Sequence, residues 1–164
     1  MQTRIRQVCL FAVVALGLVV VFAGTTLAQS NNSSIGTWKL NLAKSTYAAG
    51  TAPKSSTLKI EAAGAGIKVT VDAVAAGGTV QQWGFSGNYD GKDNPIAGNS
   101  PYGDVAAATR IDANTVRTIY KKAGTVTFTN TAVVSSDGKT MTFKGASTNA
   151  AGQTVNNVRV YDKQ

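Results

Sequence analysis

The sequence contains no histidine, and its one cysteine, Cys9, lies near the N-terminus. It has 8 acidic residues, of which Glu61 is the single glutamate. Haem ligation through histidine, zinc sites of the usual kind and nucleophilic catalysis by a Cys–His or Ser–His pair therefore lack their parts. The aspartates mostly fall at turns, where their side chains bond the local backbone, so a carboxylate acid and base pair has little support. These absences predict a protein that is not an enzyme and has no cofactor.

One stretch of the chain contains several side chains of the kind that bind calcium through oxygen atoms. Asp90, Asp93, Asn94 and Asp104 lie in one irregular stretch that is rich in Gly, Asn, Asp and Pro. Carboxylate and amide oxygens suit calcium, but the spacing is not that of a known calcium loop. We therefore predict no metal site.

The N-terminus has the three parts of an export signal. Arg4 and Arg6 precede an apolar run over residues 8–22, and small residues stand at 26–28, where signal peptidase cleaves. The run is shorter than the roughly 20 residues that a membrane-spanning helix needs. The sequence predicts a signal peptide at residues 1–28 and a mature protein that is periplasmic or extracellular, of bacterial type, with no stable membrane insertion.

The mature chain has the length of one domain. Removal of 28 of the 164 residues leaves 136 and takes Lys+Arg from 16 to 14 against 8 Asp+Glu, a net charge of +6. Only Lys121 and Lys122 are adjacent, and such scatter is typical of a solvated surface rather than of a nucleic-acid-binding stripe. We expect a flexible polar tail at residues 29–34, then a single domain at residues 35–164 that is monomeric and binds no nucleic acid.

Short strand-like runs separated by turn signals recur about every ten residues along this domain. Leu58, Ile60 and Ala62, for example, alternate with mostly polar neighbours, as a half-buried strand requires. The sharpest turn signal is Asp137-Gly138, because both residues tolerate the positive φ of a tight hairpin. The expected strands are residues 35–41, 57–62, 67–74, 79–86, 105–111, 115–121, 125–134, 140–147 and 154–162, with a short tenth strand at 94–97.

Antiparallel strands joined by tight turns in this order form a meander. Closing a meander on itself leaves no exposed edge. We therefore predict an all-β fold, a single antiparallel meander closed into a barrel of about eight to ten strands. A β-sandwich is the alternative, because the sequence neither shows nor excludes the long crossovers of a Greek key.

The domain opens with Gly36-Thr37-Trp38 within GTWKL and closes with Arg159 within RVYDK. A Gly-x-Trp on the first strand with a basic residue on the last resembles the signature of the calycin superfamily, which includes the lipocalins and fatty-acid-binding proteins. The chain also resembles small exported bacterial lipocalin-like proteins of unknown role. The resemblance implies that Gly36, Trp38 and Arg159 close one barrel end, with the guanidinium packed over the indole ring in a cation–π contact of about 0.5–2 kcal/mol.

The same resemblance implies an anion site inside the barrel. In fatty-acid-binding proteins a last-strand Arg and Tyr point inward at the ligand's carboxylate, and Arg159 and Tyr161 match that motif. Arg117 or Arg110 would supply a second cation, since a guanidinium donates paired hydrogen bonds to a carboxylate. The sequence does not fix which face of the last strand is inside. In the alternative, Arg159 only closes the barrel end and Tyr161 is a boundary residue. Residues 42–55 lack the periodicity of those proteins' helical lid.

Small side chains fill many positions that are expected to face inward. They are Ala106, Ala108, Val116, Val126, Ala132 and Val134. A barrel lined by such residues either keeps a cavity or collapses it. A cavity beside several aromatic rings would suit a small apolar or aromatic ligand. Ordinary core packing is the alternative, and for any single ring it is the favoured explanation.

The sequence therefore predicts an exported, non-enzymatic protein that holds a small hydrophobic or amphipathic molecule, including one with a carboxylate, inside a β-barrel. The expected ligand-binding residues are Trp83, Phe85, Arg117, Tyr120, Phe128, Arg159 and Tyr161. The alternative is a structural or surface-interaction β domain with a filled core and no small-molecule ligand, which would act through its basic exterior or through residues 87–104.

Overall fold

A computed structural model describes residues 32–148 and 154–164 of the chain. The predicted signal peptide and the first residues of the predicted polar tail lie outside these ranges. Within the described ranges, no helix has the length and apolar character needed to cross a membrane.

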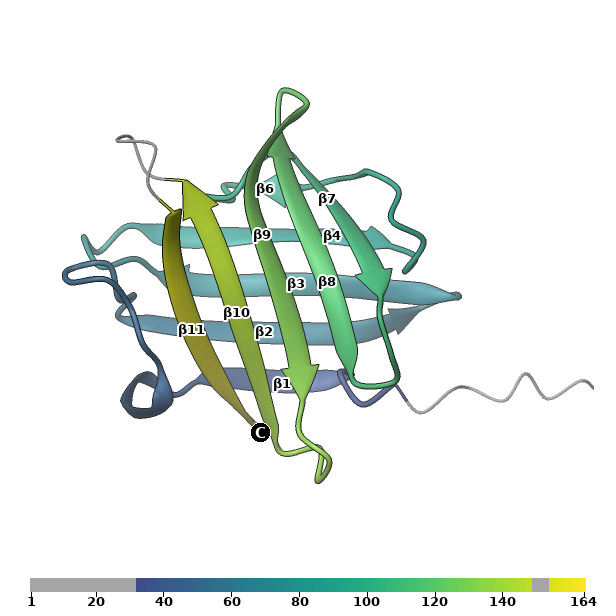
Figure 1. The fold of residues 1–164 in the computed structure, drawn as a ribbon, viewed down its shortest axis with the longest axis horizontal. Helices are drawn as coiled ribbons and strands as arrows, with labels where there is room; N and C mark the ends of the chain where they lie inside the picture. Colours follow the sequence, from purple (N-terminus) through teal and green to yellow (C-terminus); the bar gives the residue numbers. More distant parts are fainter. Residues whose placement is uncertain (1–31, 149–153) are drawn as a thin grey trace, which may run out of the picture.

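Eleven antiparallel strands form one sheet (Figure 1). Their bounds are β1 (Gly36–Leu40), β2 (Ser55–Ala63), β3 (Gly66–Val74), β4 (Val80–Gly87), β5 (Asn94–Pro95), β6 (Ala97–Gly98), β7 (Val105–Arg110), β8 (Thr115–Lys122), β9 (Thr125–Val134), β10 (Thr140–Thr148) and β11 (Thr154–Lys163). Nine of these match the predicted long strands to within two residues at each end. The expected short strand at 94–97 is divided at Ile96 into β5 and β6, which is why the count is eleven.

The strand order is β5-β7-β8-β9-β10-β11-β1-β2-β3-β4-β6, so the first long strand pairs with the last. The two edges of the sheet are the two-residue strands β5 and β6, which are separated by one residue of chain. The sheet is thus a meander that is nearly closed, and the gap between β4 and β7 is spanned by residues 88–104. This confirms the predicted all-β antiparallel barrel and fits a calycin-like architecture.

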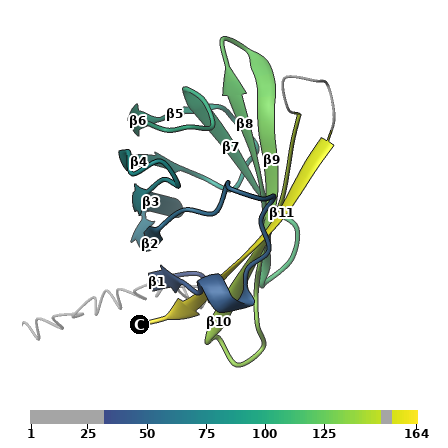
Figure 2. The same cartoon turned by 90° about the vertical axis from the view of Figure 1, so that its left-hand side faces the viewer.

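The barrel is flattened into two layers. Strands β1–β4 run across the picture behind β7–β11, which run from top to bottom (Figure 1). Figure 2 shows the two layers from the side, with β1–β4 in one and β7–β11 in the other. The inner faces of both layers carry most of the buried apolar side chains, so the core and any cavity lie between them.

A β-bulge interrupts the alternation of β9. Tyr120 pairs with Phe128 and Lys121 with Val126, so Thr127 has no opposite residue in the ladder. The extra residue reverses the side-chain alternation. Val126, expected to face inward, is therefore 56% exposed, and Thr127 contributes to the interior lining instead. The other predicted inward residues are buried or line the interior: Ala106, Ala108, Val116, Ala132 and Val134.

Trp38 lies where the first and last strands pair, and the cation over its ring is Lys163 instead of Arg159. The indole is fully buried, and its Nε1 donates to the carbonyl of Ser34 at 2.8 Å. The Nζ of Lys163 lies 5.0 Å from the ring centroid. The predicted contact with Arg159 is wrong because the β1–β11 register places Lys163 opposite Trp38, whereas Arg159 lies four residues further along β11. The first and last strands are still joined at this tryptophan.

Gly36 makes room for this arrangement. A Cβ at position 36 would lie 2.7 Å from Cε of Lys163, and the backbone φ is +139°. A side chain would push the lysine off the indole and strain the backbone. Gly36, Trp38 and Lys163 thus lie together where β1 pairs with β11.

The segment between β1 and β2 contains one short 3-10 turn, η1 (Leu42–Lys44), capped by the Asn41 side chain. From Ser45 the chain runs along β11, where Thr46 pairs with Val158. No helical lid is present in this described segment, in agreement with its weak apolar periodicity.

Candidate functional site

A cavity of about 490 Å³ lies between the two layers. This volume is within the roughly 300–1,000 Å³ of small-molecule sites. Its apolar wall on the β1–β4 layer is formed by Leu58, Ile60, Ile67, Val69, Val71 and Phe85. The opposite layer adds apolar side chains, among them Val116 and Met141, and the polar side chains of Thr118, Asn130 and Arg159.

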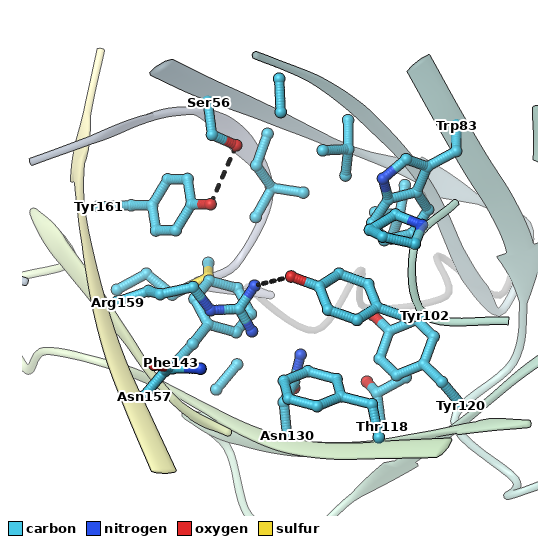
Figure 3. A pocket seen from close by; sticks show the side chains of 18 of the residues that line it. Ser56, Trp83, Tyr102, Thr118, Tyr120, Asn130, Phe143, Asn157, Arg159 and Tyr161 are labelled. Atoms are coloured by element: carbon cyan, nitrogen blue, oxygen red, sulfur yellow. Dashed lines mark hydrogen bonds between the residues drawn. The ribbon is translucent and has the colours of Figure 1, made fainter. Parts of the chain in front are cut away.

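Four aromatic rings contact one another in the cavity, and three of them, Trp83, Tyr102 and Tyr120, are labelled in Figure 3. The Tyr102 ring stacks on Phe128, with centroids 4.5 Å apart and planes 17° apart. It also meets Trp83 edge-on at 5.8 Å and Tyr120 at a tilt at 5.3 Å. Three of these rings belong to strands, and Tyr102 reaches them from the loop before β7. Such offset and edge-on pairs are favourable, so Tyr102 lies among three fixed partners.

Arg159 projects from β11 into the same part of the cavity (Figure 3). Its Nη1 donates to the Tyr102 hydroxyl at 3.0 Å. The guanidinium carbon lies 5.6 Å from the Tyr102 ring centroid, 5.4 Å from that of Phe128 and 5.3 Å from that of Phe143. The inward face of β11 is therefore the face of Arg159 and Tyr161, and Arg159 belongs to the cavity instead of the barrel closure.

The guanidinium of Arg159 has no anionic partner. Its Nε and Nη2 are buried and have no hydrogen-bond partner among the described residues. All eight acidic residues of the chain lie in the described ranges, and none of them lines the cavity. A buried charge without a counter-charge is costly. The cavity lining therefore carries a positive charge that nothing in the lining neutralises.

Burial works to lower the pKa of Arg159, but the four surrounding tyrosines, Tyr102, Tyr161, Tyr120 and Tyr47, act more strongly in the other direction and raise it. The side chain stays protonated at any physiological pH, because even an ordinary guanidinium does. The positive charge in the cavity is thus permanent.

Tyrosine hydroxyls provide much of the remaining polar lining. The Tyr161 hydroxyl donates to Oγ of Ser56 at 3.1 Å (Figure 3). The Tyr47 hydroxyl is buried without a partner in the described structure. Burial raises the pKa of Tyr47, Tyr120 and Tyr161 above the ordinary tyrosine value, although the charge of Arg159 opposes the rise. These hydroxyls are therefore neutral at physiological pH.

Asn130 adds a third group without a partner among the described residues to the cavity lining. Oδ1 of Asn130 on β9 is buried and accepts no hydrogen bond from the described residues. Asn130 and the neighbouring Thr118 are both buried polar residues of the lining. An unpaired acceptor and the unpaired donors of Arg159 thus lie in one cavity, where a bound molecule can satisfy them.

Six of the seven predicted ligand-binding residues line this cavity. They are Trp83, Phe85, Tyr120, Phe128, Arg159 and Tyr161. Arg117 does not, because it is exposed and alternates on β8 with the inward-facing Val116 and Thr118. Arg110 does not join Arg159 either, since its guanidinium carbon packs 4.0 Å from the Tyr89 ring centroid. The expected second cation is absent from the lining.

Two residues of the cavity lining, Tyr102 and Tyr47, were not predicted. Both lie outside the long strands. Strand alternation says nothing about a loop residue, so periodicity cannot assign either ring to the interior. For Tyr102 a local signal exists: it is a single large ring between Pro101 and Gly103, in a stretch of small and polar residues. For Tyr47 we find no comparable signal.

The candidate calcium ligands do not come together. Asp90 pairs with Lys92 at 3.4 Å, and Asp93 with Lys121 at 2.7 Å. Oδ2 of Asp104 accepts the backbone N–H of Ala123. No group of three or more His, Cys, Asp or Glu side chains placed to hold a metal occurs in residues 32–148 and 154–164.

No protein-family model matches the sequence, and no curated protein matches it significantly. One solved structure, described as EF1p2_mFAP2b bound to DFHBI, is similar with a TM-score of 0.47 over 82% of this chain and 97% of that chain, at 8% sequence identity. A likeness at this level is no guide to function. Function is therefore inferred from the side chains that line the cavity.

Proposed function

We propose that the protein is an exported, non-enzymatic carrier that binds one small amphipathic molecule inside its barrel. The ligand has an apolar body and an anionic end, such as a carboxylate. The apolar wall on β2–β4 takes the body, and Arg159 takes the anion. The observation that carries this proposal is the Arg159 guanidinium, whose Nε and Nη2 are buried and unpaired in a cavity of about 490 Å³.

The physical reason is the cost of leaving that guanidinium alone. Nε and Nη2 are adjacent donors in a planar fork, which matches two carboxylate oxygens. A ligand anion restores both hydrogen bonds and neutralises the charge in surroundings of low dielectric. A purely structural domain would lose little stability by replacing Arg159 with an apolar residue.

A competition titration tests the proposal. The purified protein is titrated with the neutral fluorescent probe N-phenyl-1-naphthylamine, which is then displaced by decanoate or by decanol. The two competitors share an alkyl chain and differ in the anion. We expect saturable probe binding and displacement by both, with decanoate the stronger competitor. Arg159→Met should weaken decanoate roughly 10- to 100-fold, the loss expected for charge-assisted hydrogen bonds, and leave decanol nearly unchanged.

The matched control is Arg117→Met, which removes the same charge from the exposed face of β8. It should leave both competitors at their parental affinities. Equal weakening by both variants would mean that the overall charge attracts decanoate, and would contradict a site at Arg159. No saturable probe binding would overturn the carrier and favour the structural or surface-interaction domain.

Export is the second part of the proposal, and it rests on the sequence of residues 1–28. Mass spectrometry of the full-length product recovered from the bacterial periplasm should show a mature N-terminus at Gln29. Recovery of the uncleaved chain in the cytoplasm would overturn it.

A further inference from the structure

Tyr102 occupies the position that a ligand of this cavity would take. Its ring lies between Phe128, Trp83 and Tyr120, and its hydroxyl accepts a hydrogen bond from Nη1 of Arg159 (Figure 3). It thus combines a planar aromatic body with an oxygen acceptor on the one cation of the lining. These are the two kinds of contact that the rest of the cavity offers.

The Tyr102 loop, residues 99–104, is anchored at its two ends. Asn99 bonds Gln82 and Val80 of β4 through its backbone N–H and its side chain, and the N–H of Asp104 donates to the carbonyl of Lys121 at 2.9 Å. Between these anchors, among the described contacts, the backbone bonds the barrel only where the Tyr102 carbonyl accepts the Thr127 hydroxyl.

The Tyr102 side chain is therefore held mainly by the contacts that a ligand would replace. Its ring is only partly buried, unlike Trp83, Tyr120 and Phe128, and Pro101 beside it is exposed. Moving the ring out of the cavity breaks one stacking contact, two further ring contacts, the contact of the Arg159 guanidinium with the ring and one hydrogen bond, and leaves the β-ladders intact. An entering molecule with equivalent groups restores all of them.

We infer that the Tyr102 side chain fills a binding subsite for an aromatic anion when no ligand is bound, and that the ligand is a planar aryl carboxylate that displaces this side chain. The aryl ring takes the place of the phenol ring on Phe128, and the carboxylate takes the hydrogen bond of the Tyr102 hydroxyl on Arg159. The inference rests on the proposed function and narrows its ligand from an amphipathic anion to an aromatic one.

Charge favours the aryl carboxylate over Tyr102 itself. The phenol hydroxyl accepts from one donor of Arg159, and Nε and Nη2 have no partner among the described residues. A carboxylate in the place of the phenol hydroxyl accepts from Nη1 and from the adjacent Nη2, so it pairs one more donor than Tyr102 does and carries the missing charge. The rings around Arg159 also select for a flat partner, because offset stacking requires two planes. An alkyl acid would satisfy the guanidinium but not the stacking surface of Phe128.

Three related probes test the inference. They are 2-naphthoate, the saturated decahydronaphthalene-2-carboxylate, and the neutral 2-methylnaphthalene. In the parent protein 2-naphthoate should bind at least 10-fold more tightly than either of the other two. Tyr102→Ala removes the occupant and should raise the affinity for 2-naphthoate about 10-fold or more, with a smaller rise for the neutral arene. Tyr102→Phe, which removes only the hydroxyl, should give an intermediate rise.

Amide hydrogen exchange in the parent protein gives a readout that does not depend on any variant. Saturation with 2-naphthoate should speed exchange in the Tyr102 loop and slow it in β8 and β9. Decahydronaphthalene-2-carboxylate should produce a weaker effect on the loop.

Several outcomes would overturn the inference. A fall in 2-naphthoate affinity in Tyr102→Ala would make Tyr102 a wall of the site and not its occupant. Slower amide exchange of the Tyr102 loop on ligand binding would likewise show that Tyr102 is not displaced. If decanoate binds through Arg159 but 2-naphthoate binds no better than the saturated acid, the aromatic subsite is wrong while the carrier function stands. If no probe binds, the carrier function fails and the inference fails with it.

Discussion

The two ends of the barrel interior differ in how completely their buried polar atoms are paired. At the Trp38 end, the indole side chain is 0% exposed. The one polar atom of the indole is satisfied by the carbonyl of Ser34. At the Arg159 end, two guanidinium nitrogens and the Tyr47 hydroxyl are buried with no partner in the described structure.

This difference indicates that one end of the core contributes mainly to stability and the other mainly to binding. A packed and satisfied end contributes to the free energy of folding. An end with unpaired donors reduces it, so a selected sequence keeps such groups only where they have another use. We expect substitutions at the Trp38 end to change stability, and substitutions at the Arg159 end to change binding.

The largest expected effect is on Trp38. Trp38→Ala removes a fully buried indole and leaves a void beneath Lys163, which should lower the free energy of unfolding by about 3–5 kcal/mol. Denaturant titration measures it. Ligand affinity of the folded variant should stay close to that of the parent. A thermal melt that matched the parent would contradict the role of Trp38 in closure.

Gly145, which lies against the Phe128 ring of the aromatic cluster, should show the next largest effect. A Cβ at this position would clash with that ring. Gly145→Ala must therefore push the Phe128 ring, at a cost of about 1–3 kcal/mol for overpacking. Gly77→Ala is the control, since nothing lies within 4 Å of a Cβ there. Equal melting temperatures for the two variants would sink the prediction.

Alkaline pH should act on the Arg159 end. The pKa values of Tyr47, Tyr120 and Tyr161 are raised by burial, so unfolded chains lose these protons first. Their contribution to stability is complete below the unfolded pKa of about 10 and is lost as the pH rises toward the folded values. Unfolding free energies measured from pH 8 to 12 should be flat at first and then fall. A rise above pH 10 would contradict the burial of these hydroxyls.

Ser56→Ala should have a smaller effect. It removes the acceptor of the Tyr161 hydroxyl and should lower the free energy of unfolding by about 1 kcal/mol. Ser86→Ala on the exposed face of β4 should change nothing measurable. A loss that was the same in both would mean that the buried hydrogen bond contributes nothing.

Arg159→Met should change stability least. The substitution loses one hydrogen bond and three ring contacts, and it relieves a buried charge without a counter-charge. These terms oppose one another, so the free energy of unfolding should stay within about 1 kcal/mol of the parent. A loss as large as that of Trp38→Ala would make Arg159 a structural residue and remove the contrast between the two ends.

Much of the fold could be predicted because apolar and polar residues alternate along each strand. Alternation in 125–134 and in the neighbouring runs fixed the strands and most inward positions. It failed at Val126, where one extra residue in β9 reverses the faces. A bulge depends on the partner strand and on Thr127 binding the Tyr102 carbonyl, and a single run of sequence does not contain that information.

The candidate site was predicted where it lies on strands and missed where it lies on loops. Trp83, Tyr120 and Phe128 follow from strand faces, and Arg159 from the resemblance at the last strand. The pairing of Arg159 with Trp38 failed because it requires the β1–β11 register, which joins residues far apart in the chain. Tyr102 was missed because tertiary contacts alone bring its ring into the barrel.

The pairing of β1 with β11 also shapes how the chain folds. The ladders within β1–β4 and within β7–β11 join strands that are neighbours in sequence, so their loops close at little entropic cost. Leu40 and Tyr161, in contrast, are partners more than a hundred residues apart. Long-range pairing of this kind slows folding. The two layers should form early as separate meanders, and the search for the β1–β11 contact should set the folding rate.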